Sequence, residues 1–352
     1  VVHLLVCLLL FIFIIDLLGK MMGIDFSSFD LTKRTVVIDA DTLVYSSAAA
    51  QQKLQYTATN KHNGKAQIFE GIKLYKAWLE EHSLSADDFD LTNEVIITGE
   101  ARFAFHSIKQ KIEAILQATQ ADDYRICIGG IGNFRMEYKA DFVNYKGVRP
   151  PKPVFLQDCK EFVKGKYKDK VLVADGQEAD DILTIIGWWY FKQKGTNKNS
   201  WLKEKLILSC VDKDIQANVV GYFYNYQYPE VGIEWNSGDV MVKKFCTQIL
   251  VGDSVDNIDG IKYLTKEIQT KYGMRKTSGC GKVSAEAILG KCKGRKEMLN
   301  AVIEAYISSW PNDYKQRLQE MCFFLWLRRE ENEMFSFEKY AEKMGVEYAQ
   351  NK

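Results

Sequence analysis

The chain has 352 residues, of which 47% are hydrophobic and 26% are charged, and its formal net charge is +1. These values are typical of a globular protein with one large domain or two ordinary ones. They exclude a protein that binds nucleic acid through a high overall positive charge, so any basic surface must be local. Eight cysteines without a CxxC pair indicate neither a zinc site nor a disulfide framework. We expect reduced, mostly buried thiols and a cytoplasmic location.

The first eighteen residues are almost wholly apolar, broken only by His3 and Asp16. A run of this length could be a marginal membrane span or the core of a signal peptide. However, no basic residue precedes it, no small-residue cleavage site follows it, and Met21 and Met22 come directly afterwards. We therefore expect residues 1–20 to be an apolar leader outside the native protein, and we expect no membrane partner.

Short segments at 36–38, 125–128, 171–174 and 206–208, which are apolar except for Arg125, predict buried strands. Amphipathic helical patterns lie between them, including one at 100–118, and residues 56–69 with Asn63-Gly64 predict a hairpin. Strands that alternate with helices indicate an α/β fold, with a mainly parallel central sheet flanked by helices.

Carboxylates follow three of the four predicted strands. They are Asp39 after the first strand, Glu178, Asp180 and Asp181 after the third, and Asp212 and Asp214 after the fourth. Taken alone, the acids at 178–181 fit helix capping and metal binding equally well. Because the carboxyl ends of parallel strands form the ligand-binding edge of such sheets, we expect all six to lie together. A divalent cation would relieve their repulsion, and oxygen ligands without histidine favour Mg²⁺ or Mn²⁺ over zinc.

Two local basic regions are present. Residues 133–170 interleave Lys and Arg with Tyr138, Phe142 and Tyr145, between two strands that lead to the acidic edge. A charge run is ordinarily a solvated helix face, but this position favours an element that binds a nucleic-acid backbone. Residues 260–300 hold ten Lys/Arg against three acids. There, Gly279-Cys280-Gly281-Lys282 precedes a predicted helix at 283–289. Glycines before a helix can leave amides free for phosphate, although a plain loop is the commoner explanation for such a pattern alone.

Taken in order, the segments VVIDAD, NFRMEYKADFVNYKGVR, GQEADD, SCVDKD, GDSVDNIDGI and GCGKVSAEAIL resemble the 5′-nuclease (flap endonuclease) superfamily. The closest resemblance is to the bacteriophage 5′-to-3′ exonucleases, and it spans residues 36–289. It implies a PIN-like 5′-nuclease fold with a catalytic α/β domain at 21–238. It also implies a helical DNA-binding region at 239–352, which would contain a helix–three-turn–helix element at 252–289.

The resemblance also implies roles for individual residues. The metal ligands would hold two Mg²⁺ ions, or Mn²⁺, with Asp181 lying between the ions. The first ion would be held by Asp39, Glu178 and Asp180, and the second would be held or approached by Asp212, Asp214, Asp253 and Asp256. Asp41 would at best support the first set. The DNA contacts would be Lys146 on the scissile phosphate, Arg149 and Arg135 on other phosphates, Tyr145 on the end nucleotide, and Gly279, Gly281 and Lys282 on the duplex backbone.

The chain departs from the family pattern at two places. The family usually has an aspartate after the second strand, where this chain has Gly129 and Gly130, so the first metal site would be rich in water or served by Glu137. Residues 263–278 interrupt the helix–three-turn–helix element with a basic insert. This insert either extends the DNA contact or is a solvated loop.

The resemblance therefore predicts a monomeric, metal-dependent enzyme that hydrolyses double-stranded DNA from 5′ ends, with flap cleavage as a related activity. It would act in the cytoplasm, that of the host cell if the protein is viral. One alternative is a 5′ nuclease that removes RNA primers from RNA–DNA hybrids, because backbone contacts carry no base code. An alternative of another class is a DNA-binding protein without catalysis on the same fold.

Overall fold

The computed structural model describes residues 23–147, 151–194, 205–275 and 279–347. The predicted leader at 1–20 and Arg149 lie outside these ranges. The chain forms two compact units. One, called the sheet unit, comprises residues up to 39, residues 115–149 and residues from 170 onwards. The other, called the hairpin unit, comprises residues 40–114 and 150–169.

The sheet unit is built on six strands in the order β6-β5-β1-β7-β8-β9. Five strands run parallel, and β9 pairs antiparallel with β8 at one edge. Their bounds are β1 Thr35–Asp39, β5 Asp123–Gly129, β6 Val171–Ala174, β7 Leu206–Ser209, β8 Gly221–Tyr224 and β9 Ile233–Asn236. The predicted fold class and all four predicted strands are confirmed, whereas β8 and β9 were not predicted.

Helix α7 (Ala179–Lys194) packs against β1, β5, β6 and β7 in the middle of the sheet. The apolar residues Ile182, Leu183, Ile185 and Ile186 are buried on it. The helix starts five residues after the end of β6, so its first turn is held at the carboxyl edge of the sheet. Packing of the apolar face thereby fixes the position of the acids that open this helix.

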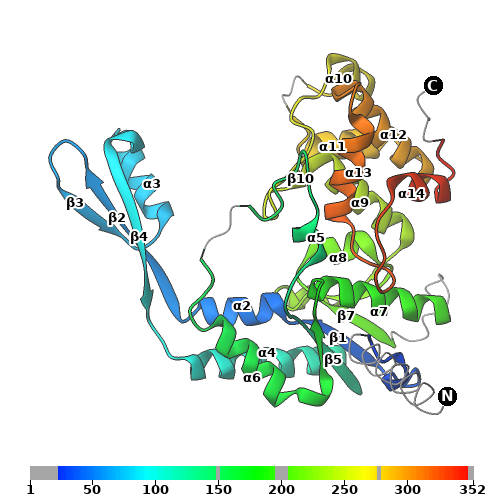
Figure 1. Cartoon of the computed structure of the whole chain (residues 1–352), viewed down its shortest axis with the longest axis horizontal. Coiled ribbons are helices and arrows are strands. Elements are labelled where there is room, and N and C mark those ends of the chain that lie inside the picture. Colours follow the sequence, from blue (N-terminus) through cyan, green and yellow to red (C-terminus); the bar gives the residue numbers. More distant parts are fainter. Residues whose placement is uncertain (1–22, 148–150, 195–204, 276–278, 348–352) are drawn as a thin grey trace, which may run out of the picture. The chain divides into compact units, whose positions relative to one another are not determined.

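The helices after β7 form the second half of the sheet unit around α9 (Figure 1). Their bounds are α8 Lys213–Asn218, α9 Gly238–Val251, α10 Lys266–Tyr272, α11 Lys282–Leu289, α12 Arg295–Ser309, α13 Tyr314–Leu325 and α14 Phe337–Lys343. One hydrophobic core joins Tyr145 and Ala217 to residues as far along the chain as Val346. The domain boundary predicted at 238 stays a prediction, but this core extends across it.

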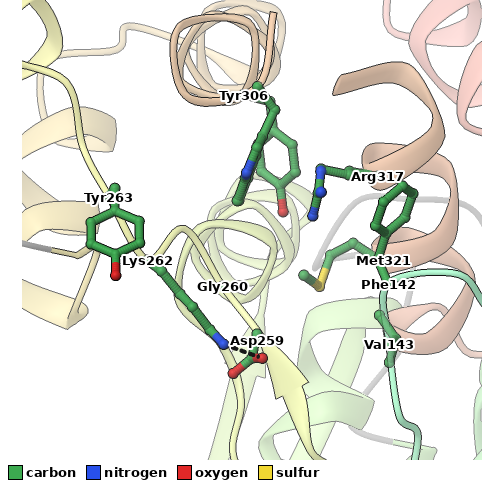
Figure 2. A pocket seen from close by; sticks show the side chains of 10 residues that line it. Phe142, Val143, Asp259, Gly260, Lys262, Tyr263, Tyr306, Arg317 and Met321 are labelled. Atoms are coloured by element: carbon green, nitrogen blue, oxygen red, sulfur yellow. Dashed lines mark ion pairs between the residues drawn. The ribbon is translucent and has the colours of Figure 1, made fainter. Parts of the chain in front are cut away.

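Two short strands, β10 (Gly252–Asp253) and β11 (Ile258–Asp259), pair antiparallel after α9. The chain crosses itself here so closely that a Cβ on Gly252 would lie 2.3 Å from the Gly260 nitrogen. A pocket opens between the loop after β11 and helices α12 and α13 (Figure 2). Helix α10 lies inside the predicted insert at 263–278, so the described part of that insert is largely helical.

The hairpin unit holds an antiparallel sheet in the order β3-β2-β4, covered by α3 (Ile72–Glu81). The strands are β2 Gln52–Asn60, β3 Ala66–Phe69 and β4 Phe89–Ile97, so the predicted hairpin is confirmed and extended by one strand. The unit also contains α2 (Asp41–Ala49), α6 (Leu156–Lys166) and most of α4 (Ala101–Thr119). Rings of Phe105 and Phe162 stack with centroids 4.6 Å apart.

Two expectations about the whole chain can be compared with the described residues. Seven cysteines are described; all are free thiols and all but Cys292 are buried. Across the described ranges, no helix has the length and apolar character required to cross a bilayer.

Candidate active site

Acids that follow different strands meet at the carboxyl edge of the sheet unit. Asp39 is the last residue of β1 and is 1% exposed. Asp212 follows β7 and caps α8, accepting a hydrogen bond from the Asp214 N–H at 2.8 Å. Burial raises the pKa of the Cys210 thiol, and the charges of Asp39, Asp180 and Asp212 raise it further. These three carboxylates, which come from three segments of the chain, therefore lie near enough to act on one buried thiol.

A second group of acids gathers around Asp214. Burial raises the pKa of Asp214 to about 8, and the like charges of Asp212 and Asp253 add to the effect. Gln248 donates a hydrogen bond to Asp214, and the Lys213 Nζ lies 2.7 Å from an Asp253 oxygen. The cluster thus carries more negative charge than its neighbours neutralise.

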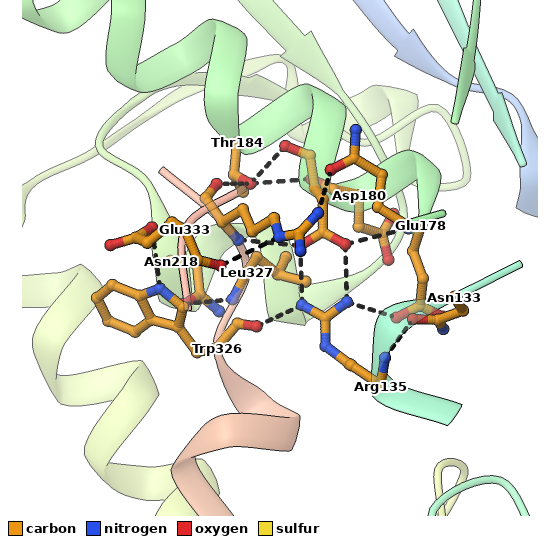
Figure 3. A network of polar contacts seen from close by, with 12 residues as sticks. Asn133, Arg135, Glu178, Asp180, Thr184, Asn218, Trp326, Leu327 and Glu333 are labelled. Carbon is orange, nitrogen blue, oxygen red and sulfur yellow. Dashed lines mark hydrogen bonds and ion pairs between the residues drawn. The ribbon is translucent and has the colours of Figure 1, made fainter. Parts of the chain in front are cut away.

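Arg135 and Asp181 form a buried ion pair between α5 (Phe134–Glu137) and α7 (Figure 3). Both side chains are fully buried, and the two terminal guanidinium nitrogens donate to the two Asp181 oxygens at 2.7 and 2.8 Å. Arg135 was predicted to bind a DNA phosphate and Asp181 to lie between two metal ions. In this structure they neutralise each other inside the protein, because a buried charge needs a partner.

The segment after α13 supplies the remaining hydrogen bonds of this ion pair. The Arg328 N–H donates to Asp181 at 2.9 Å, and Arg135 donates to the Trp326 carbonyl. Thr184 donates to the Arg328 carbonyl at 2.7 Å, and the Asn218 side chain bonds the backbone of residues 325 and 327. Figure 3 shows this network. The sequence analysis missed it, since no motif marks residues 325–328.

Glu178 is shared by three donors. It accepts hydrogen bonds from Tyr145 Oη at 2.9 Å, from Arg135 at 3.2 Å and from Lys146 Nζ. The Lys146 Nζ also lies 3.9 Å from Asp256, and Lys146 has a φ of 54°, which is uncommon for a residue other than glycine. The two residues predicted to meet the substrate therefore face the acidic edge, with Tyr145 buried against the Phe324 ring.

Gly130 stands where an acid was expected, and the carboxylate of another residue, Asp175, occupies the space beside it. A Cβ built on Gly130 would lie 2.1 Å from the Asp175 Oδ1, and that oxygen accepts a hydrogen bond from the Ile131 N–H at 2.8 Å. Asp175 comes from the turn after β6. Glu137, the expected substitute, is exposed at the end of α5.

The glycines predicted to bind the DNA backbone line an open hollow in the loop before α11. A cavity of about 400 Å³ is bounded by residues 259–262 and 279–281. Gly279 packs on the carbonyls of Ile261 and Lys262, while Gly281 precedes α11 with no side chain capping the helix. Lys282 is exposed beside it. Such a loop leaves helix amides open to an anion.

The donor set can be compared with what a hard cation needs. Among the described residues, no three His, Cys, Asp or Glu side chains are arranged to hold an ion as they stand. Glu178 and Asp181 are engaged by basic side chains. In the group around Asp214, Lys213 pairs with Asp253, but the carboxylates still outnumber this lysine and offer only oxygen donors, which fits Mg²⁺ or Mn²⁺.

Tyr226 is a further polar group at this edge that sequence reasoning missed. Its hydroxyl is buried, and no hydrogen-bond partner for it occurs within the described ranges. Burial raises the pKa of Tyr226, and the charges of Asp39 and Cys210 raise it further. Tyr226 follows β8, a strand that was not predicted, so nothing in the sequence placed it near the acids.

No family model and no curated protein matches the chain. Solved structures do resemble it. One is the T5 D15 protein co-crystallised with metal ions, at 10% identity and a TM-score of 0.38, covering 82% of this chain and 98% of that one. Another is a T5 5′-exonuclease mutant, at 11% identity and a TM-score of 0.36, covering 83% of this chain and 99% of that one. A third is a bacteriophage T5 D15 flap endonuclease variant in a pseudo-enzyme–product complex with DNA and metal ions. It has 13% identity and a TM-score of 0.33, and the match covers 63% of this chain and 90% of that one. The phage 5′ nucleases that the motifs resemble are thus among the solved structures that the chain resembles.

Proposed function

We propose that this protein is a divalent-metal-dependent 5′ nuclease that hydrolyses DNA phosphodiester bonds from 5′ ends, with flap cleavage as a related activity. One observation carries the proposal. Carboxylates from four separate segments converge at the carboxyl edge of the sheet unit, where the Lys146 Nζ lies 3.9 Å from an Asp256 oxygen. A structural role does not require so many like charges in one place.

Asp39, Asp180, Asp212, Asp214 and Asp253 would hold the cations. Bound divalent ions supply an activated water and Lewis-acid stabilisation of the leaving oxygen. Asp212 and Asp214 are presented by the start of α8, and Gln248 orients Asp214. The buried Arg135–Asp181 pair would hold the first turn of α7 in place, rather than contacting substrate.

Lys146 would bind the scissile phosphate. Its ammonium is paired with Glu178, and an incoming phosphate would compete for that charge. Contacts with the backbone of the DNA duplex would come from the loop of Gly279, Gly281 and Lys282. In this proposal the enzyme is a cytoplasmic monomer, and it uses double-stranded DNA with a 5′ end or flap as substrate.

The test is cleavage of a 5′-labelled duplex in Mg²⁺, followed over time for wild type, Asp214→Asn and the exposed control Asp169→Asn. Removing Asp214 should lower the rate by about 10²-fold or more. DNA affinity in chelator should be unchanged, because the basic surface is intact. The control should cleave like wild type. Since the variant also removes one of several like charges, it should be at least as stable as wild type in chelator.

Wild-type cleavage that persists in excess chelator, or full activity of Asp214→Asn, would overturn the proposed mechanism. A protein that binds the duplex but never cuts it would instead be a DNA-binding protein without catalysis. The cleavage rates of flap DNA and of an RNA–DNA hybrid are measured beside that of the duplex. Faster cleavage of the hybrid would indicate primer removal, and faster cleavage of the DNA substrates would indicate DNA processing.

A further inference from the structure

The pocket of Figure 2 lies outside the acidic edge and has no role in the proposed hydrolysis. It encloses about 190 Å³ between α12, α13, the loop after β11 and the chain at Phe142. Its floor is Tyr306 and Met321, both buried. This volume is below the roughly 300–1,000 Å³ of pockets that bury drug-sized ligands, so it has room for only part of one nucleotide, such as a phosphate group.

Arg317 makes this pocket attractive to an anion. Its guanidinium lies 3.9 Å from the Phe142 ring centroid and 4.8 Å from that of Trp310, so it is held between two aromatic faces. The Nε of this guanidinium donates to an Asp313 carboxylate oxygen at 2.8 Å. The terminal nitrogens point into the pocket (Figure 2).

Tyr263 supplies an aromatic face at the mouth. Its side chain is 75% exposed, while its backbone carbonyl is fixed by a hydrogen bond from Ser309 at 3.1 Å. Lys262 stands beside it on the rim, 2.7 Å from Asp259. An exposed ring on a fixed backbone, next to cationic groups, is the combination that stacks on nucleobases and holds phosphates.

The pocket walls connect two parts of the proposed DNA path. Glu320 accepts hydrogen bonds from the N–H groups of Asp141, Phe142 and Val143 at 2.8, 2.6 and 2.6 Å. This clamp fixes the chain just before Lys146. The opposite wall is formed by Asp259, Gly260 and Lys262, which also line the glycine-lined cavity before α11.

We propose that this pocket binds one unpaired nucleotide of the 5′-ended strand, with its base stacked on Tyr263 and its phosphate on Arg317. The inference rests on the proposed function for the identity of the strand, because Lys146 would contact a phosphate of that strand. The binding itself requires no cleavage.

The experiment uses the full chain in chelator and two duplexes that differ by one unpaired 5′ 2-aminopurine nucleotide. Wild type should bind the overhanging duplex about tenfold more tightly than the blunt one, and its binding should quench the 2-aminopurine fluorescence. Tyr263→Ala and Arg317→Gln should lose both effects and bind the two duplexes equally. Tyr228→Ala, which removes an exposed tyrosine elsewhere in the sheet unit, should behave as wild type.

Equal affinity of wild type for both duplexes, or quenching that survives Tyr263→Ala, would overturn the inference. Equal preference for a 3′ overhang would overturn its assignment to the 5′ strand. Because Tyr263 is exposed, its replacement should leave the melting temperature unchanged, which excludes misfolding as the cause. Metal-dependent cleavage without an overhang preference would leave the proposed function intact, whereas binding to neither duplex would overturn both.

Discussion

Asp181, which the sequence predicted to lie between two metal ions, has a structural role in this structure. Its two oxygens are taken by Arg135, and the Arg328 N–H adds a third bond. Leaving one member of a buried pair without the other costs far more than replacing both with apolar residues. The pair therefore acts on stability as well as on the geometry of the acids beside it.

Asp181→Asn should lower the free energy of unfolding by about 3–5 kcal/mol, because it leaves the Arg135 charge buried without a counter-charge. Urea unfolding followed by circular dichroism measures this. The double variant Asp181→Leu with Arg135→Met should recover most of the loss. An unchanged unfolding midpoint in Asp181→Asn would mean that the pair is not buried in solution.

Lys146→Ala should slow single-turnover cleavage by about 10²–10³-fold, since one charged donor at a reacting phosphate is typically worth that much. The affinity for DNA in chelator should fall far less. The exposed Lys139→Ala, from the same basic segment, is the matched control and should keep the wild-type rate. An unchanged single-turnover rate in Lys146→Ala would remove this residue from the mechanism.

At the residue scale, the positions of the acids could be predicted from the sequence, whereas their hydrogen-bond and ion-pair partners could not. Asp39, Asp212 and Asp214 could be predicted because each follows an apolar run that ends at one sheet edge. The partner of Asp181 could not, since Arg135 is 46 residues away and periodicity carries no information on such pairs. Asp175, which fills the space above Gly130, reads in the sequence only as a turn residue.

Among the secondary-structure elements, the β10–β11 turn depends on two glycines that cross at close range. A Cβ on Gly260 would lie 2.2 Å from the Val251 carbonyl carbon and 2.5 Å from the Leu250 carbonyl oxygen. Both neighbours are backbone atoms of the last two residues of α9, so they have little freedom to move. The turn positions Asp253 on one side and the glycine-lined cavity on the other.

Gly260→Ala should destabilise the protein by about 1–3 kcal/mol, the usual cost of forcing extra volume into a packed site, and should weaken duplex binding. Thermal melting and a binding titration measure the two effects. Gly281→Ala is the control for stability, because nothing lies within 4 Å of the Cβ it would add. If both variants melt alike, the crossing is looser than described.

The elements that sequence reasoning missed share one physical cause. β8 and β9 are only four residues each, and Gly221 interrupts the apolar run at 219–224 that contains β8. Helix α14 follows a charged stretch, yet Phe337 is 1% exposed. In each case burial comes from distant partners, and neither local propensity nor periodicity reports it.

At the scale of the whole molecule, the end of the described chain belongs to the core. Trp326, Phe337 and Tyr340 are buried in the cluster that surrounds α9. Removal of one buried aromatic residue typically costs about 3–5 kcal/mol. Three such losses approach the entire 5–15 kcal/mol that stabilises an ordinary domain.

A chain ending at Leu325 should therefore lack a cooperative melting transition, as measured by circular dichroism or calorimetry. A chain ending at Glu347 keeps every described residue and should melt like the full-length protein. A cooperative transition at an unchanged temperature in the shorter chain would show that the core does not need this segment.

The Arg328 N–H that bonds Asp181 lies 147 residues further along the chain. During translation, the aspartate and its arginine thus emerge from the ribosome long before the backbone that completes their hydrogen bonding has been made. Until then, the nascent polypeptide must keep this pair hydrated or only partly enclosed. Assembly of the acidic edge is consequently a late event in biosynthesis, which follows the emergence of α13 from the exit tunnel.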